Sequence, residues 1–372
     1  MDNEKDIIND PLSDVCCLRL TNLQSSLPRH RIDALLVSSH KNIRWLTGFT
    51  GSSGLLLVDR RKSYLFTDGR YIVQAKQEVS GTEIVITHKP AAFIAKALKT
   101  GAIKRLGLEE QNLTLAAYRQ LETALNQSAT KLVPIRQGIV ENQRRIKDDS
   151  ELERIGRAIE ITGKAFSAIS AEIKPGIKER ELALLLEWAM RKLGAEAVSF
   201  ETIVASGQRS ALPHGRASDK VIESGDLVVI DFGASVDGYC ADVTRTLMVG
   251  EPSAEQKKIY NLISRVQKLG IETARPGILV SQIDLAIRQE IKDAGYGNYF
   301  VHSSGHGLGL DVHEGPRIYK TDKTVLQPGM VFTIEPGVYL PGLGGVRIED
   351  MLVVTQDGCQ VLTGGIPKYE FI

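Results

Sequence analysis

Two similar stretches of sequence decide the fold of this chain. They align without gaps: Val221-Ile-Glu-Ser-Gly-Asp-Leu-Val-Val-Ile-Asp-Phe-Gly233 and Val325-Leu-Gln-Pro-Gly-Met-Val-Phe-Thr-Ile-Glu-Pro-Gly337. In each, a glycine-containing turn leads into a short apolar run, the pattern of a turn followed by a buried strand. Each stretch also follows a Pro-Gly break, at Pro175-Gly176 and at Pro276-Gly277. The C-terminal part of the chain therefore contains an internal repeat.

A pair of helices accompanies each copy of this repeat. In the first copy, the capping-box pattern Ser150-x-x-Glu153 starts one helix, and a second helix is expected over 179–193. In the second copy, Ser253-x-x-Gln256 starts the first helix, and the second is expected over 281–294. A glycine follows each second helix, as is usual at a helix C-terminus. The repeating unit is thus helix–helix–strand.

The repeat places two carboxylates at equivalent positions inside apolar strands. Asp231 in the first copy aligns with Glu335 in the second. A buried carboxylate is costly unless it is protonated, paired or bound to a cation. A single residue of this kind is most simply explained by a salt bridge, whereas two at equivalent positions favour a shared site.

A second carboxylate accompanies Asp231 on the strand that returns beside it. Asp237-Gly238 is a strong hairpin signal, and the strand after it carries Asp242. A four-residue loop would place Asp242 directly opposite Asp231. A two-residue turn would instead place Thr244 opposite Asp231, with Asp242 diagonal to it. Either register puts both carboxylates on one face, within about 5–8 Å.

The second copy repeats this arrangement. After Glu335, a Pro/Gly-rich loop over 336–345 leads to a strand over 346–354 that carries Glu349. The two hairpins thus bring two Asp and two Glu together about a pseudo-twofold axis. Four carboxylates repel one another unless cations lie between them, so we expect a metal site. Carboxylate oxygens suit hard ions such as Mg²⁺ or Mn²⁺.

Histidines are concentrated in one glycine-rich segment of the second copy. Its sequence is Val301-His-Ser-Ser-Gly-His-Gly-Leu-Gly-Leu-Asp-Val-His313, which contains His302, His306 and His313. An imidazole ligand moves the expected metal towards Mn²⁺, Co²⁺, Fe²⁺ or Zn²⁺. A solvated loop would be the simpler explanation, but three histidines so close together favour a metal site.

Residues 15–140 form a separate α/β domain in this interpretation. Short apolar strands alternate there with helical patterns, and the charged stretch 143–149 marks the boundary with a second domain over 145–372. Residues 1–14 are polar and are expected to be flexible. The expected strands are 33–38, 54–59, 63–67, 83–87, 105–109 and 131–135, and the expected helices are 91–100 and 113–127.

The overall composition excludes several classes of protein. The 372 residues include 46 Lys+Arg and 45 Asp+Glu, a net charge of +1, whereas nucleic-acid binding requires a basic surface. The apolar runs are far shorter than the roughly 18–20 residues of a membrane span, and the N-terminus lacks a signal-peptide pattern. Four cysteines without regular spacing are typical of a reduced protein. We therefore expect a cytoplasmic protein with no nucleic-acid or membrane partner.

These motifs resemble those of the M24-type pita-bread metallopeptidases, which include aminopeptidase P, prolidase and methionine aminopeptidase. Residues 15–135, with Trp45-Leu-Thr-Gly-Phe-Thr-Gly-Ser-Ser-Gly54 and Leu65-Phe-Thr-Asp-Gly-Arg70, resemble the creatinase-type N-terminal domain. The resemblance implies an α/β creatinase-like domain followed by an α+β pita-bread catalytic domain with an internal pseudo-twofold repeat. The catalytic-domain motifs are Ile230-Asp-Phe-Gly, Ala241-Asp-Val-Thr-Arg-Thr, Gly305-His-Gly-Leu-Gly, Val312-His-Glu, Ile334-Glu-Pro-Gly and Arg347-Ile-Glu-Asp.

The resemblance also implies a ligand set for two divalent metal ions. Mn²⁺ is the expected metal, with Co²⁺, Zn²⁺ and Fe²⁺ as alternatives. Asp242 and Glu349 would bridge the two ions, and Glu335 would also act as general base for a bridging hydroxide. The five implied ligands are Asp231, Asp242, His306, Glu335 and Glu349.

Further residues are implied to surround the substrate. His313 would stabilise the oxyanion, and His214, in Leu212-Pro-His-Gly215, would bind substrate or shuttle a proton. His302 would line a proline pocket, and Arg347 would lie between the metal site and the substrate. A purely structural role is the alternative for His214, His302 and Arg347. Trp45 would contact the substrate across the interface of a homodimer.

The two-domain organisation favours a proline-directed enzyme over a methionine aminopeptidase, so the expected partners are proline-containing peptides. The expected activity is that of an aminopeptidase P, which hydrolyses the N-terminal Xaa-Pro bond, because residues 45–54 resemble the bacterial members of that group. The alternative is a prolidase, which cleaves Xaa-Pro dipeptides and recognises a free carboxylate next to the site. A third alternative is a metal-free interaction module, which the complete ligand set disfavours.

Overall fold

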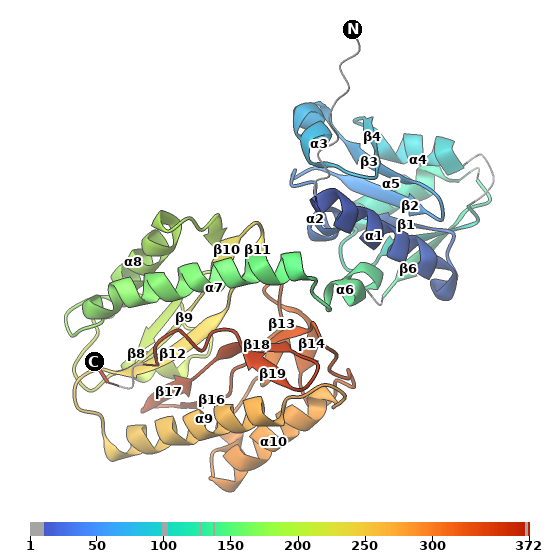
Figure 1. Cartoon of the computed structure of the whole chain (residues 1–372). Coiled ribbons are helices and arrows are strands. Elements are labelled where there is room, and N and C mark those ends of the chain that lie inside the picture. Colours follow the sequence, from blue (N-terminus) through green and yellow to red (C-terminus); the bar gives the residue numbers. More distant parts are fainter. Residues whose placement is uncertain (1–10, 99–102, 127, 137, 369–370) are drawn as a thin grey trace. The chain divides into compact units, whose positions relative to one another are not determined.

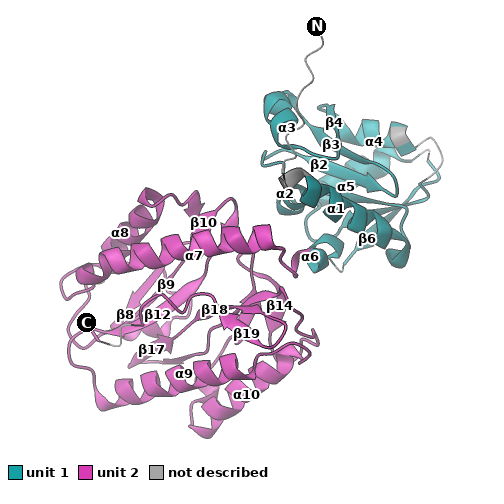
Figure 2. Cartoon of the chain, in the orientation of Figure 1, with its two compact units in different colours: residues 1–143 teal, residues 144–372 magenta. Residues whose placement is uncertain are grey.

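In the computed structural model the chain forms two units, residues 1–143 and residues 144–372 (Figure 2). The structure describes residues 11–98, 103–126, 128–136, 138–368 and 371–372. Residues 1–10, most of the segment expected to be flexible, lie outside the described residues. Helix α1 (Pro11–Ser26) begins directly after them, so residues 11–14 are helical and that part of the expectation is wrong.

Helix α1 forms because one of its faces is apolar. Cys16, Leu20 and Leu23 recur at intervals of four and three residues, and all three are buried. The same periodicity continues to Leu27, which is fully buried in the short 3₁₀ turn after the helix. The sequence therefore contains the pattern of this helix, although polar residues surround the apolar positions.

Unit 1 is a six-stranded mixed sheet in the order β4-β3-β2-β1-β5-β6 (Figure 1). Strand β1 runs antiparallel to β2 and parallel to β5. Each strand lies within one residue of the bounds that the sequence predicted. The strands are β1 (Ala34–Val37), β2 (Leu55–Asp59), β3 (Ser63–Thr67), β4 (Glu83–Ile86), β5 (Arg105–Glu109) and β6 (Lys131–Ile135).

Helices cover both faces of this sheet. Ala34 and Leu36 of β1 share a buried core with Ile94 of α4 and Leu121 of α5. Helices α1 and α2 pack against each other and against β2. The helices after α1 are α2 (His40–Thr47), α3 (Ile72–Glu78), α4 (Pro90–Leu98), α5 (Leu115–Ala124) and α6 (Ile139–Arg144), of which only α4 and α5 were expected.

Unit 2 places its strands between two pairs of helices, α7 with α8 and α9 with α10 (Figure 1). Helix α9 begins with the predicted capping box of Ser253 and Gln256. Helix α7 instead uses Asp148 as its N-cap, with Glu151 completing the box. The pattern Asp148-x-x-Glu151 competes with Ser150-x-x-Glu153, and Asp and Ser are equally good N-caps. The four helices are α7 (Asp149–Ile169), α8 (Glu179–Lys192), α9 (Ala254–Thr273) and α10 (Val280–Asp293).

The described strands of unit 2 form four sheets. Their orders are β12-β9-β8, β11-β10-β7, β14-β13-β15-β18-β19 and β16-β17. Strands β10 and β11 extend the first hairpin, and β16 and β17 extend the second. The bounds are β7 (Ala197–Val198), β8 (Ile203–Ser206), β9 (Leu227–Phe232), β10 (Ala234–Val236), β11 (Tyr239–Cys240), β12 (Val243–Met248), β13 (Gly305–Gly307), β14 (Glu314–Ile318), β15 (Val331–Ile334), β16 (Gly337–Leu340), β17 (Gly344–Arg347), β18 (Asp350–Val354) and β19 (Cys359–Val361).

The internal repeat is confirmed by equivalent backbone contacts. The amide of Gly176 donates to the carbonyl of Ile222 at 2.9 Å, and the amide of Gly277 donates to the carbonyl of Leu326 at 2.9 Å. Both glycines have positive φ angles, 101° and 88°, which favour glycine. Each Pro-Gly break therefore anchors the segment that leads into the carboxylate-bearing strand of its own copy.

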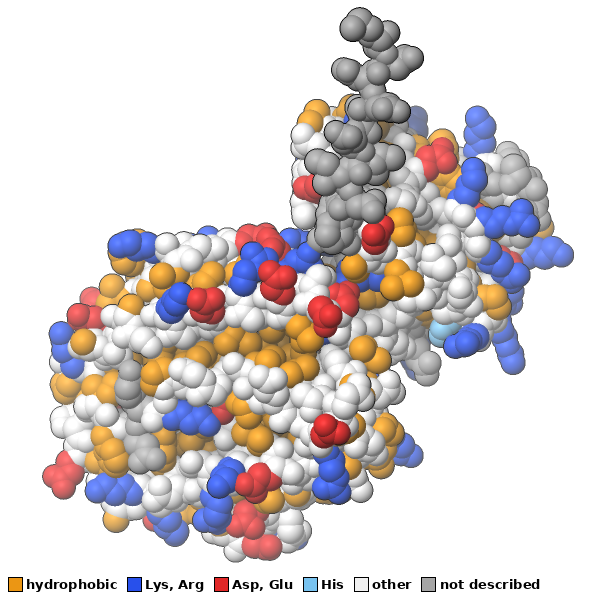
Figure 3. Space-filling model, in the orientation of Figure 1, with side chains coloured by type: hydrophobic (Ala, Val, Ile, Leu, Met, Phe, Trp, Pro, Cys, Tyr) orange, Lys and Arg blue, Asp and Glu red, His pale blue; other side chains and the backbone are white. Residues whose placement is uncertain are grey.

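The surface agrees with the balanced composition. On the face shown in Figure 3, Lys and Arg side chains are interspersed with Asp and Glu. Within the part of the chain that the structure describes, no helix combines the length and the apolar character of a membrane span.

Candidate metal centre

The first hairpin adopts the two-residue turn. Asp237 and Gly238 have φ angles of 48° and 75°, and Asp231 lies opposite Thr244 in the ladder. Of the two registers that the sequence allowed, this is the one with Asp242 diagonal to Asp231. A turn with positive φ at both central residues matches the twist of the strands and favours this register.

The second hairpin carries its carboxylates at the same kind of position. Glu335 directly follows β15, and Glu349 directly precedes β18, whose residue Asp350 pairs with Ile334. The sequence predicted a loop over 336–345 and one strand over 346–354. Instead, β16 and β17 form a ribbon that includes most of that loop and the first residues of the expected strand. The expected strand is interrupted at 348–349. Asp242 lies at the equivalent interruption, between β11 and β12.

The two hairpins contact each other through their inner edges. The Glu349 amide donates to the Thr244 carbonyl at 3.1 Å, and the Thr244 hydroxyl donates to Glu349 Oε2 at 2.8 Å. The hydroxyl of Thr246 donates to the Arg347 carbonyl at 2.7 Å. These bonds bring the carboxylates of the two copies to one place, which sequence alone does not specify.

His306, on β13, completes the cluster. Its Nε2 lies 3.5 Å from Asp242 Oδ2 and 3.6 Å from Glu335 Oε1. Ligand atoms of Asp242, His306 and Glu349 all lie within 4.8 Å of one another. Burial, with the charge of His313 as the next cause, lowers the pKa of His306 to about 3. The imidazole is therefore neutral at physiological pH, as a metal ligand must be.

The buried carboxylates of the cluster repel one another. Burial and the charges of neighbouring carboxylates raise the pKa values of Asp242 and Glu335 well above the usual range. Burial, followed by the charge of Asp231, raises the pKa of Glu349 to about 8. Asp231 Oδ1 and Glu349 Oε1 are buried and accept no hydrogen bond from any described residue.

Divalent cations fit this donor set. Free carboxylate oxygens and one neutral imidazole nitrogen converge there, and a cation would offset both the repulsion and the missing hydrogen bonds. The residues that the sequence predicted as metal ligands are thus brought together, with Asp231 linked to the others through Arg347.

Arg347 connects the cluster to the segment that carries His214. Its guanidinium donates to Asp231 Oδ2 at 2.6 Å, to Thr244 Oγ1 at 3.0 Å and to the Pro213 carbonyl at 2.9 Å. Burial alone would lower the pKa of Arg347, but the charges around it hold this pKa well above its usual value. Arg347 is therefore a fixed cation beside the site.

Sequence reasoning missed Tyr339. The hydroxyl of this buried residue accepts from Arg347 at 2.8 Å and lies 2.9 Å from His302 Nε2. Burial raises the pKa of Tyr339 to about 12, so its hydroxyl stays protonated. Tyr339 lies in the stretch taken for a loop, and its place on β16 became visible only when that strand formed.

The remaining predicted histidines lie around the cluster. The ring of His313 meets that of His306 edge to face, with centroids 4.3 Å apart, and the His313 side chain is exposed. Burial lowers the pKa of His302 to about 3 and also lowers the pKa of His313, and both groups are affected by the charge of His214. His214 is exposed. One side of the cluster therefore presents imidazoles to solvent.

Comparison with known proteins gives the family. The Metallopeptidase family M24 matches residues 153–356, and the Creatinase/Prolidase N-terminal domain matches residues 19–146. This chain belongs to metallopeptidase family M24. All the predicted metal ligands lie within the part of the chain that matches the family.

Relatives within family M24 span almost the whole chain. The Xaa-Pro dipeptidase of Pyrococcus horikoshii is 43% identical over 338 residues, which cover 91% of this chain and 94% of that protein. The structure of a Xaa-Pro dipeptidase from Bacillus anthracis has a TM-score of 0.92 and 41% identity, covering 96% of this chain and all of that one. That of an X-Pro aminopeptidase from Thermotoga maritima MSB8 has a TM-score of 0.84 and 41% identity, covering 92% and 98% of the two chains.

Trp45 lies outside the M24 region, and its side chain is buried in unit 1. Only 5% of it is exposed, the Arg19 guanidinium lies 4.4 Å from the ring centre, and Arg19 donates to the Trp45 carbonyl at 2.9 Å. Contact with a substrate or a neighbouring subunit would require the indole to leave this core position. Trp45 therefore has a packing role here.

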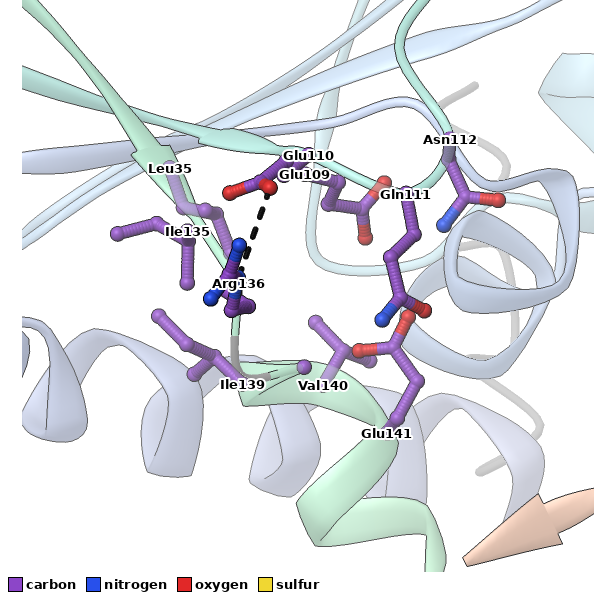
Figure 4. Close-up of a pocket in the computed structure, with 11 residues that line it drawn as sticks. Leu35, Glu109, Glu110, Gln111, Asn112, Ile135, Arg136, Ile139, Val140 and Glu141 are labelled. Atoms are coloured by element: carbon purple, nitrogen blue, oxygen red, sulfur yellow. Dashed lines mark ion pairs between the residues drawn. The ribbon is translucent and has the colours of Figure 1, made fainter.

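A second acidic cluster, in unit 1, is structural. Figure 4 shows Glu109 and Glu141 beside a small cavity, with an ion pair between Arg136 and Glu110 at its edge. Glu109 accepts from the Ser38 amide at 2.6 Å, which ties β5 to the start of α2. The cavity has room for about one water molecule, too little for a substrate.

Proposed function

We propose that the chain is a Xaa-Pro dipeptidase that uses two divalent metal ions. The observation that carries this proposal is the buried cluster of Asp242, His306, Glu335 and Glu349, with Asp231 held beside it. The sequence favoured an aminopeptidase P, but the relatives support its alternative better, because the 43% identical protein is a Xaa-Pro dipeptidase. The X-Pro aminopeptidase structure at 41% identity keeps the aminopeptidase as the second candidate.

The five ligands would hold the two ions, for which Mn²⁺ remains the first candidate. Metal ions in such a site polarise the scissile carbonyl and lower the pKa of water. Glu335 is suited to accept a proton because burial and the charge of Glu349 raise its pKa above that of an ordinary carboxylate. His313, exposed at the open side, would donate a hydrogen bond to the carbonyl oxygen.

The remaining polar residues would bind and orient the peptide. His214 would donate a proton or a hydrogen bond from the exposed segment, and Arg347 would hold that segment through Pro213. The half-buried His302 would line the pocket for the proline, and its ring packs edge to face on the buried ring of Phe300, with centroids 5.1 Å apart.

A dipeptide substrate has a free carboxylate close to the scissile bond, so a cation is needed near the metal centre. Arg317 lies opposite His306 in the β13–β14 ladder, and cross-strand neighbours share a face of a sheet. Its side chain is exposed, and its guanidinium lies 4.7 Å from the ring centre of Tyr319. We therefore assign carboxylate recognition to Arg317, a residue that sequence reasoning missed.

One experiment separates the two activities. The Mn²⁺-loaded protein is assayed on Xaa-Pro dipeptides and on Xaa-Pro-Yaa tripeptides side by side. We expect the dipeptides to be cleaved with the higher kcat/KM. Preference for the tripeptides would establish the aminopeptidase instead. Failure to cleave either peptide, in a protein that also binds no divalent metal, would support the metal-free interaction module.

A homodimer and a cytoplasmic location remain predictions. Sedimentation of the full chain at micromolar concentration tests the first, since only monomer would contradict it. Fractionation of cells that express the chain tests the second.

A further inference from the structure

Each copy of the repeat holds a histidine-bearing segment in the same way. Ser206 donates its amide (2.7 Å) and its hydroxyl (2.9 Å) to Glu179 Oε1. Ser304 donates its amide (3.2 Å) and its hydroxyl (2.7 Å) to Asp284 Oδ1. Both carboxylates are completely buried, and both lie on the second helix of their copy, α8 or α10.

The two serines lie beside the carboxylate-bearing strands of their copies, but at different ends. Ser206 pairs with Val228 at the start of β9, whereas the Ser304 carbonyl accepts from the Glu335 amide, just past the end of β15. Ser206 is the last residue of β8, the neighbour of β9. Ser304 directly precedes β13, the neighbour of β15. Strands β9 and β15 lead to Asp231 and Glu335, respectively. Each contact therefore joins a second helix to the segment beside the carboxylate-bearing strand of the same copy.

In the first copy, Glu179 joins both ends of residues 206–218. Its Oε2 accepts the amide and the hydroxyl of Ser218, at 3.0 and 2.6 Å, and Arg209 Nε at 3.0 Å. Arg209 in turn donates to the carbonyl of Arg216 at 2.6 Å. The closed segment between these anchors carries His214.

In the second copy, Asp284 acts together with Arg288. Arg288 Nε donates to Asp284 Oδ2 at 2.7 Å, and the other guanidinium nitrogens donate to the carbonyls of Phe300 and His302. Residues 300–306 are thereby held at their centre and, through Ser304, next to β13. This segment carries His302 and His306.

A contribution to stability alone does not explain why Glu179 and Asp284 are carboxylates. A buried ionised group costs free energy, and apolar side chains of similar volume often stabilise a core at least as well. Unlike an apolar side chain, a carboxylate fixes the geometry around it, because several hydrogen-bond donors must converge on its two oxygens. Here the donors come from the segments that present histidines to the metal centre, apart from Arg288, which lies on α10 and itself donates to carbonyls of residues 300–306.

We propose that Glu179 and Asp284 are paired positioning residues, one in each copy of the repeat. Glu179 fixes the segment that presents His214, and Asp284 fixes the segment that presents His302 and His306. The catalytic consequence rests on the proposed peptidase function, whereas the positioning itself does not.

The test compares Glu179→Gln and Asp284→Asn by hydrogen–deuterium exchange of the full chain, without substrate. We expect Glu179→Gln to raise exchange over 206–218 by about tenfold and to leave 300–306 unchanged. Asp284→Asn should raise exchange over 300–306 by a similar factor and leave 206–218 unchanged. Each variant is thus the control for the other, and Glu187→Gln, elsewhere on α8, should change neither segment.

Metal binding and kinetics supply a second, independent measurement. Asp284→Asn should weaken Mn²⁺ binding by about tenfold, since it loosens the segment that carries His306. Glu179→Gln should keep full Mn²⁺ occupancy and raise KM for Xaa-Pro about tenfold, with a smaller change in kcat.

Two results would overturn the proposal: equal changes in both segments for either variant, or wild-type exchange in both. If Glu179→Gln does not fold, Ser206→Ala and Ser218→Ala remove only hydroxyl donors and should raise exchange in the same segment by a smaller factor. If the wild type cleaves no Xaa-Pro peptide, the proposed function fails, while the exchange and Mn²⁺ measurements still decide the positioning.

Discussion

At the residue scale, the carboxylates of Asp242 and Glu349 are both buried within the cluster. Each is buried beside other carboxylates. We expect Asp242→Asn and Glu349→Gln to lower kcat/KM by at least about a hundredfold while the chain remains folded, because each removes a charge that a metal requires. Peptide assays and circular dichroism check this. Glu223→Gln, an exposed site, is the matched control. Full activity in either buried variant would contradict the assigned site.

Arg317 permits a second test at this scale. We expect Arg317→Ala to raise KM for a Xaa-Pro dipeptide about tenfold or more, because it removes a charge-assisted hydrogen bond to the terminal carboxylate. The same variant should hardly change KM for the dipeptide amide, which lacks that charge. A parallel change for both substrates would show that Arg317 does not recognise the carboxylate.

At the scale of elements, Gly233 allows the first hairpin to bend between β9 and β10. A Cβ atom at this position would lie 1.8 Å from the Ala241 carbonyl oxygen. We expect Gly233→Ala to lower the free energy of unfolding by more than about 2 kcal/mol, because the backbone must move. Gly358→Ala is the matched control, since nothing lies within 4 Å of its Cβ. Urea unfolding of both variants tests this, and equal midpoints would contradict it.

Glu179, the first residue of α8, should make the stability of the chain depend on pH. Burial alone would raise the pKa of Glu179, but hydrogen bonds from Ser218 and Ser206 outweigh it and hold the pKa below its usual value. The stabilisation is therefore complete above the unfolded-state pKa of about 4.3 and is lost as the pH falls through the folded-state value. At pH 7, the free energy of unfolding of Glu179→Gln should be about 2 kcal/mol lower than that of wild type.

Urea unfolding at a series of pH values measures this difference. The difference in the free energy of unfolding between wild type and Glu179→Gln should become smaller as the pH falls below about 4. Glu187→Gln, on the same helix, should follow wild type throughout. A gap that stays constant with pH would show that the Glu179 charge contributes nothing to stability.

At the scale of the whole molecule, metal removal should affect the two units differently. Each unit has its own buried core, and the ligand cluster lies entirely in unit 2. Mn²⁺ at about a hundredfold over its Kd should raise the Tm of unit 2 by roughly 5–10 °C relative to chelated protein. Scanning calorimetry should show the transition of unit 1 unchanged. Equal shifts of both transitions, or none, would contradict this.

Much of the fold follows from local patterns. Alternating apolar residues and turn signals predicted all six strands of unit 1, and the repeat predicted four helices of unit 2. The errors arose where two local signals compete, as with Asp148 and Ser150 at the start of α7. They also arose where a strand depends on its partner, as with β16 and β17 in a Pro/Gly-rich stretch.

The sequence by itself predicted where a metal site lies in this protein. Buried carboxylates at equivalent places in a repeat, with histidines nearby, have few explanations other than a cation. Only the tertiary structure decided the hairpin register, the links from Arg347 to Tyr339 and Asp231, and the contacts of Glu179 and Asp284. The physical reason is range. Periodicity and turns act between neighbours in sequence, whereas these contacts join residues that meet only when the helices and strands of unit 2 pack together.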